Sequence, residues 1–194
     1  MSLFFETIKV QNRTIYNLDL HNKRLNYTIE QNFGKKSDID LKNFITPPKD
    51  STLYRCKVIY DKDIKSVDFY PYTPKNIQSF KIISSDIKYN YKYADRCDID
   101  SLFNRRGDCD EILIADKKGF LKDTSIANIA LKIDGIWHTP ENPLLKGTMR
   151  EKLIMENILK QSILKVKDIQ KLESFAIMNA MIGFKVIENP KFKV

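Results

Sequence analysis

The stretch that decides the fold runs from Asp123 to Arg150 and reads DTSIANIALKIDGIWHTPENPLLKGTMR. At its centre, the pair Asp134-Gly135 favours the tight turn of a β-hairpin. The turn joins two apolar runs, 129–133 and 136–139, which we predict as the strands of that hairpin. The stretch therefore predicts a sheet in the second half of the chain.

The end of the same stretch predicts the start of a helix. Thr148 follows Gly147 and stands three residues before Glu151, which is the spacing of a capping box. An apolar-periodic run continues the predicted helix to about Gln161. A helix start also exposes backbone N–H groups and the positive end of the helix dipole, so it can hold a phosphate. Two interpretations of Thr148 stay open, a cap alone or part of an anion site.

The flanking sequence mixes helix and strand. Asn17 is a candidate cap for a helix over 18–31, and Gly34 follows as a stop signal. The polar, tyrosine-rich run 86–96 is the best candidate for a link between two parts. We expect an α+β protein with a mixed α/β domain over 1–87 and a β-rich domain over 88–194. The other predicted elements are a hairpin over 4–16, strands at 53–60, 66–70, 77–84 and 111–115, and a short helix and strand near 175.

Composition narrows the class of protein. The 194 residues are 42% hydrophobic and 30% charged, which suffices for a core, and no apolar run approaches the ~18 residues of a membrane span. The net charge of +8 would suit an anionic ligand, but acids interrupt the basic residues throughout. We therefore expect a cytoplasmic protein with a solvated lysine-rich surface and without a nucleic-acid or membrane partner.

Several kinds of site are disfavoured by motif. The three cysteines form no CxxC pair and only two histidines are present, so no metal site is expected. The sequence contains no GxGxxG, no GxxxxGK[ST] and no GxSxG. Nucleotide-binding loops and serine-hydrolase chemistry are thereby disfavoured.

Five motifs in consistent order, from about residue 4 to 182, resemble the class IV aminotransferase family. The family comprises fold-type IV pyridoxal phosphate enzymes, among them branched-chain and D-amino acid aminotransferases and 4-amino-4-deoxychorismate lyases. The resemblance implies a two-domain fold, with a small α/β N-terminal domain and a β-rich pseudo-barrel C-terminal domain. The matching residues are Phe5-Glu6-Thr7, Leu20-His21 with Arg24-Leu25, Tyr91-Lys92-Tyr93-Ala94-Asp95-Arg96, Asp123 to Ile129, and Leu144 to Arg150.

The resemblance assigns a role to each matching residue. Lys92 takes the place of the lysine that forms the Schiff base with pyridoxal 5'-phosphate and then shuttles the proton; Lys88 is the competing candidate. Asp123 stands where the family usually has a glutamate facing the pyridine nitrogen. Arg24 takes the position of the phosphate-binding arginine, with Gly147 and Thr148 as its partners. Ser125 and Asn128 follow as further cofactor contacts, although local turn bonding suits them nearly as well.

The lysine segment, with Arg96 four residues after Lys92, is closer to the lyases than to the transferases. Phe5 stands where D-amino acid aminotransferases have a tyrosine hydroxyl, which weakens the transferase interpretation. The implied reaction converts 4-amino-4-deoxychorismate to 4-aminobenzoate and pyruvate, in folate biosynthesis. Its substrate is a small anion with two carboxylates, for which Arg55, Arg105 and Arg150 are candidate partners.

Two alternatives remain at this stage, an aminotransferase for D- or branched-chain amino acids and a non-catalytic basic binding module. Colour would separate an enzyme from a binding module, because a pyridoxal Schiff base absorbs visible or near-ultraviolet light. The resemblance further implies a homodimer with the cofactor between the two domains.

Overall fold

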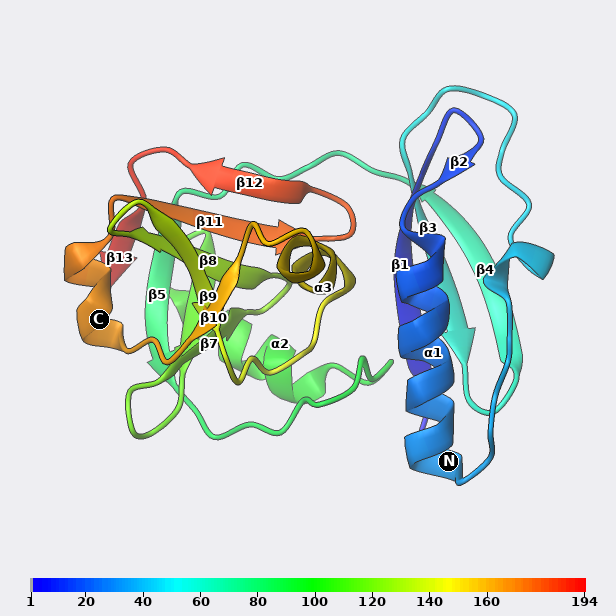
Figure 1. The fold of residues 1–194 in the computed structure, drawn as a ribbon, viewed down its shortest axis with the longest axis horizontal. Helices are drawn as coiled ribbons and strands as arrows, with labels where there is room; N and C mark the ends of the chain where they lie inside the picture. The colour runs from blue at the N-terminus through cyan, green and yellow to red at the C-terminus, as the bar shows by residue number, and fades with distance from the viewer. Residues whose placement is uncertain (1) are drawn as a thin grey trace. The chain divides into compact units, whose positions relative to one another are not determined.

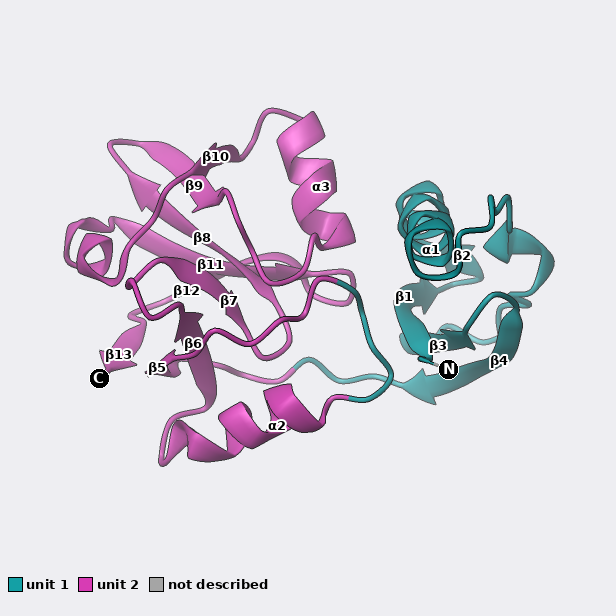
Figure 2. Cartoon of the chain, turned by 90° about the horizontal axis from the view of Figure 1, so that it is seen from below, with its two compact units in different colours: residues 1–74, 91–95 teal, residues 75–90, 96–194 magenta. Residues whose placement is uncertain are grey.

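The computed structural model describes residues 2–194 and divides the chain into two compact units (Figure 2). Unit 1 extends to Pro74 and includes Tyr91–Asp95, whereas unit 2 comprises Lys75–Asn90 and Arg96–Val194. This division differs from the predicted one at residues 87 and 88, and Lys92 lies in unit 1 rather than in the C-terminal part. Backbone hydrogen bonds to the first strand hold the 91–95 segment there, and such bonds leave no pattern in side chains.

Unit 1 is an antiparallel four-stranded sheet with one helix, α1, along it (Figure 1). The strands follow the order β2-β1-β3-β4, and the predicted first hairpin is confirmed. Alternate residues of β1 are buried beside Leu25 and Ile29 of α1, as period-2 and helical spacing require. The elements are β1 (Phe4–Gln11), β2 (Thr14–Ile15), α1 (Leu18–Phe33), the 3₁₀ helix η1 (Leu41–Asn43), β3 (Tyr54–Tyr60) and β4 (Ile64–Pro71).

Both ends of α1 fall close to their predicted positions. The helix ends before Gly34, whose φ of 65° suits a residue without Cβ. At the start, Asn17 is the N-cap as predicted, but it is left-handed and makes no side-chain cap hydrogen bond. Its backbone carbonyl instead accepts from the N–H groups of Leu20 and His21.

Unit 2 is β-rich, as predicted, and its nine strands form one branched sheet. The main path runs β10-β9-β8-β7-β6-β5-β13, while β11 pairs with both β8 and β12. Branching at β8 curls the sheet around a core, as in a pseudo-barrel. The strands are β5 (Ser79–Ser84), β6 (Glu111–Ala115), β7 (Leu121–Thr124), β8 (Asn128–Ile133), β9 (Ile136–Pro140), β10 (Lys160–Ser162), β11 (Ser174–Asn179), β12 (Gly183–Ile187) and β13 (Lys191–Lys193).

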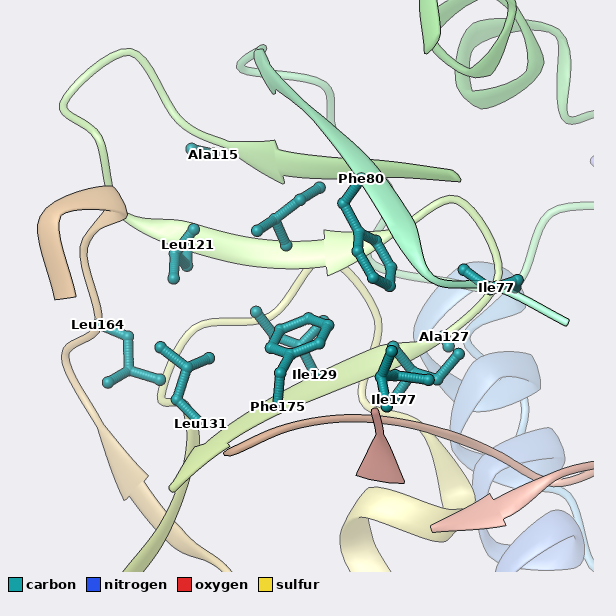
Figure 3. Packing of buried hydrophobic residues seen from close by; sticks show 12 residues of the cluster. Ile77, Phe80, Ala115, Leu121, Ala127, Ile129, Leu131, Leu164, Phe175 and Ile177 are labelled. Atoms are coloured by element: carbon teal, nitrogen blue, oxygen red, sulfur yellow. The ribbon is translucent and has the colours of Figure 1, made fainter. Parts of the chain in front are cut away.

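The core of unit 2 lies between β5, β6, β7, β8 and β11 (Figure 3). Phe80 and Phe175 meet edge to face with ring centroids 5.0 Å apart. Leu113, Ile129 and Leu131, all fully buried, surround this pair. The Asp134-Gly135 hairpin between β8 and β9 is confirmed.

The helices of unit 2 depart from prediction at three points. Helix α3 (Thr148–Met155) ends six residues before Gln161, because the chain turns at Asn157, which is left-handed with φ 57°, and continues into β10. Gly147, not Thr148, is its N-cap. Helix α2 (Cys97–Phe103) was not predicted; the 3₁₀ helices are η2 (Asn104–Arg106) and η3 (Val166–Lys171). Among the described residues, no helix has the length and apolar character that crossing a bilayer requires.

Candidate active site

Lys92 lies against the first strand of unit 1. The backbone N–H of Phe5 donates to the carbonyl of Lys92 at 2.9 Å, and that of Ala94 donates to the carbonyl of Leu3 at 2.8 Å. Phe4 and Tyr93 pair as an isolated antiparallel bridge. This pairing sets Lys92 beside Phe5, and the Lys92 Nζ lies 4.4 Å from the centroid of the Phe5 ring.

The competing lysine, Lys88, belongs to unit 2. It lines a hollow of about 440 Å³ together with Lys122, Lys146, Glu141 and Leu144. The two candidate lysines, four residues apart in sequence, therefore belong to different units.

Glu6 is a fully buried carboxylate on the face of β1 that also carries Ile8 and Val10. His21 Nδ1 lies 2.6 Å from Glu6 Oε2. Arg24 donates to the same carboxylate through Nε, at 2.8 Å, and through Nη2. Two residues one turn apart on α1 thus bind one carboxylate from β1. The sequence pattern already gave the signal, since Glu6 occupies an apolar position of the strand.

Opposing effects set the charges in this group. Burial alone would raise the pKa of Glu6, but the Arg24 charge and the contact with His21 lower it to about 2. Burial lowers the pKa of His21, and the charges of Arg24 and Lys92 lower it as well. The hydrogen bond to Glu6 and the charge of Glu6 oppose this shift. At neutral pH, a carboxylate therefore faces Arg24 while the histidine stays neutral. Lys92 adds a second basic group, which makes this part of unit 1 suitable for an anion.

Arg24 was predicted to bind phosphate, and in the structure it binds Glu6. These bonds fix the guanidinium, whose side chain is 14% exposed. Its contact with phosphate stays a prediction.

Asp123 is the centre of the second group, in unit 2, where it is 4% exposed at the end of β7. Its carboxylate accepts from Asn128 Nδ2 at 2.8 Å and from the backbone N–H of Leu145 at 2.9 Å. Burial raises the pKa of Asp123 to about 6, although both hydrogen bonds and the charge of Arg150 oppose the rise. A cation placed against this carboxylate would lower that pKa again.

Asn128 also holds the segment that precedes α3. Its Nδ2 donates to the carbonyl of Leu145 at 2.8 Å. A Cβ built on Gly147 would lie 2.0 Å from Asn128 Oδ1, so glycine is required for Asn128 to reach Asp123. The structure thus brings Asp123, Asn128 and Gly147 together, and their contact with a cofactor stays a prediction. The contact of Leu145 was missed, because a backbone N–H leaves no signal in the sequence.

The remaining predicted residues are placed as follows. Thr148 is buried in the first turn of α3, whose N–H groups have no intrahelical acceptor. Ser125 is buried in the turn between β7 and β8, and its backbone N–H donates to Glu111 Oε1 at 3.3 Å. Arg150 is 2% exposed and donates to the carbonyl of Pro140. It therefore stabilises the interior, and its suggested role at an open substrate-binding mouth is wrong.

Comparison with known proteins identifies relatives of this chain. Residues 90–188 match the family model described as amino-transferase class IV. An uncharacterized protein of Haemophilus influenzae is 35% identical over 185 residues, which cover 92% of this chain and 97% of that protein.

Solved structures agree with the match to the amino-transferase class IV family model. A protein from Haemophilus somnus 129PT, provisionally named 4-amino-4-deoxychorismate lyase, superposes with a TM-score of 0.85 at 29% identity, covering 94% of this chain and 98% of that one. A hypothetical aminotransferase from Mycobacterium tuberculosis in its PLP-bound form has a TM-score of 0.80 at 12% identity, covering 99% and 81%, and is similar in fold alone.

Proposed function

Because the chain belongs to the amino-transferase class IV family, whose members use pyridoxal phosphate, we propose that it is a lyase that converts 4-amino-4-deoxychorismate to 4-aminobenzoate and pyruvate. The observation that carries the choice of reaction is the contact between the Phe5 ring and Lys92 Nζ. A phenyl ring offers no hydroxyl to an amino acid carboxylate at the position where the D-amino acid aminotransferases have a tyrosine. The likeness to the Haemophilus somnus protein supports the same choice.

The residues of both units suit pyridoxal phosphate. Asp123 is a buried carboxylate whose two N–H donors are neutral, and a protonated ring nitrogen would supply the positive charge that lowers its raised pKa. Arg24 and the N-terminal turn of α3 are suited to the phosphate, since both present N–H donors with positive charge. Lys92 offers the amine for covalent attachment.

Bound pyridoxal phosphate supplies an electron sink for the carbon next to the substrate nitrogen. Lys92 Nζ takes the proton from that carbon and holds it. The enolpyruvyl oxygen then leaves the adjacent carbon with its bonding electrons, and the ring becomes aromatic. The released enolpyruvate takes up one proton to become pyruvate, so the atoms of the substrate equal those of the two products. Asp123, by its charge, keeps the electron sink protonated.

The family description also favours a second reaction, amino transfer. The substrates would then be D- or branched-chain amino acids. In both cases the substrate is a small anion, and we propose a homodimer without nucleic-acid or membrane partners. Assaying the purified protein for pyruvate release from 4-amino-4-deoxychorismate, beside amino transfer from several D- and L-amino acids, separates the two reactions.

Covalent attachment at Lys92 is the first prediction. Borohydride reduction of the protein loaded with pyridoxal phosphate should fix the label on Lys92, which peptide mass mapping identifies. Lys92→Arg should remove the label, whereas Lys88→Arg, the matched control in unit 2, should retain it. A label on Lys88, or none, would refute the assignment of Lys92.

A further inference from the structure

The turn between β7 and β8 is held by hydrogen bonds to both backbone groups of one residue, Ser125. The backbone N–H of Ser125 donates to Glu111 Oε1 at 3.3 Å, and its carbonyl accepts from Arg96 Nη2 at 3.1 Å. Glu111 belongs to β6 and is 2% exposed, and Arg96 immediately precedes α2. Two residues distant in sequence therefore hold the backbone N–H and the backbone carbonyl of Ser125.

This turn connects the two side chains that matter most in unit 2. Asp123 is the last residue but one of β7, Asn128 begins β8, and the two residues are direct partners in the sheet. Inside the turn, Thr124 Oγ1 accepts from the backbone N–H of Ala127 at 2.9 Å. A shift of Ser125 would therefore move Asp123 or Asn128, because only one residue separates it from Asp123 along the chain.

Neither charged residue is explained by packing alone. Glu111 is a buried carboxylate on a strand whose other four residues are buried and apolar, and burial raises its pKa. Its Oε1 accepts from the N–H of its own neighbour Ile112 as well as from Ser125. Arg96 also binds Asp100 Oδ1, at 3.3 Å, one turn along α2. A buried carboxylate is costly to keep, which argues for a role at the turn.

We propose that Arg96 and Glu111 are positioning residues that clamp the Ser125 peptide and thereby hold Asp123 at the orientation its carboxylate needs. The importance of that orientation rests on the proposed function, but the clamp itself is a property of unit 2. Arg96 is also the last residue of the segment that carries Lys92. The resemblance to the lyases in that segment thus includes a residue that acts on the turn after Asp123.

The clamp is tested first without cofactor, through the backbone N–H of Leu145, whose acceptor is Asp123 Oδ2. Arg96→Ala should accelerate hydrogen exchange of this amide about tenfold or more, as expected for loss of a charge-assisted bond that fixes its acceptor. Arg96→Met, which keeps the aliphatic stem, should do the same if the alanine variant folds poorly. Arg106→Ala is the matched control, because Arg106 binds the carbonyl of Phe103 and lies over the Phe103 ring.

Amides of the β11–β12 pairing report global stability and should exchange at their native rates in all these variants. Unchanged exchange of Leu145 in the Arg96 variants, or equal acceleration throughout unit 2, would overturn the proposal. Glu111→Gln, which keeps an acceptor oxygen, should preserve slow exchange, whereas Glu111→Ala should not.

The second arm is a double-mutant cycle on affinity for pyridoxal phosphate, measured by spectroscopic titration. Arg96→Ala should weaken binding about 3- to 10-fold in the native background and less than about 2-fold in Asp123→Asn, because its effect passes through Asp123. Equal losses in both backgrounds would contradict the coupling. If the native protein binds no pyridoxal phosphate, the proposed function fails, and the exchange measurement still decides whether the clamp exists.

Discussion

Asp123 stands where the resemblance implies a glutamate facing the pyridine nitrogen. The family's usual glutamate is one methylene longer, and here the shorter arm is held by Asn128 and by the N–H of Leu145. These bonds fix the carboxylate from the sides and leave its charge available. The charge, rather than the length of the side chain, is what a protonated ring nitrogen requires.

The prediction for Asp123 follows from that charge. Asp123→Asn should slow proton abstraction at least about tenfold, or about 1.4 kcal/mol of barrier, and leave phosphate binding largely intact. Asp123→Glu should keep most activity. Single-turnover kinetics beside cofactor titration measures the two effects separately. Full activity in Asp123→Asn would remove Asp123 from the mechanism.

Glu6 gives a prediction about stability and pH. Its pKa is lowered to about 2 in the folded protein, so its contribution to the free energy of unfolding is complete above the unfolded value of 4.5 and is lost as the pH falls toward 2. The shift corresponds to about 3 kcal/mol. Glu6→Gln should cost about that amount at pH 7 and flatten the acid dependence, as measured by urea unfolding at several pH values.

The control for Glu6 is Asp19→Asn, an exposed carboxylate in the first turn of α1. It should change the free energy of unfolding by less than about 0.5 kcal/mol. A Glu6→Gln variant as stable as the native protein from pH 3 to 7 would contradict the role given to Arg24 and His21.

At the scale of elements, the start of α3 depends on contact with β8. Gly147→Ala should displace Asn128 and break its bond to Asp123, because the added Cβ would lie 2.0 Å from Asn128 Oδ1. We expect a loss of about 1–3 kcal/mol in the free energy of unfolding, as for overpacking elsewhere. Thermal or urea denaturation measures this loss.

Asn128→Ala supplies the matching test, since it removes the clashing atom. The double variant Gly147→Ala/Asn128→Ala should be about as stable as Asn128→Ala alone. Additive losses in the double variant would show that the cost of the added methyl group does not come from its clash with Asn128.

At the scale of the whole molecule, we expect a homodimer. Symmetric pairing is the commonest assembly of soluble proteins, and the resemblance to the family implies it. Sedimentation at micromolar concentration should give about twice the 22.7 kDa mass of the chain. A monomer with bound cofactor and full activity would refute the dimer and leave the chemistry standing.

Local sequence determined the parts of this protein that depend on short-range physics. The alternation in β1, the helix that ends at Gly34 and the hairpin at Asp134-Gly135 follow from strand period, helical spacing and turn chemistry. The resemblance singled out Lys92 and Asp123 from their motifs. In each case the decisive residues lie within about ten positions of one another.

Tertiary structure alone decided the contacts between distant segments. Three sets of hydrogen bonds join residues far apart in sequence. They are the bonds that hold residues 91–95 against β1, the bond from the Leu145 N–H to Asp123, and the bonds of Ser125 to Glu111 and Arg96. The early end of α3 likewise comes from a turn at Asn157 that buries Leu159. Backbone groups are the same at every residue, so their partners leave no mark in the sequence and are fixed only when the sheets assemble.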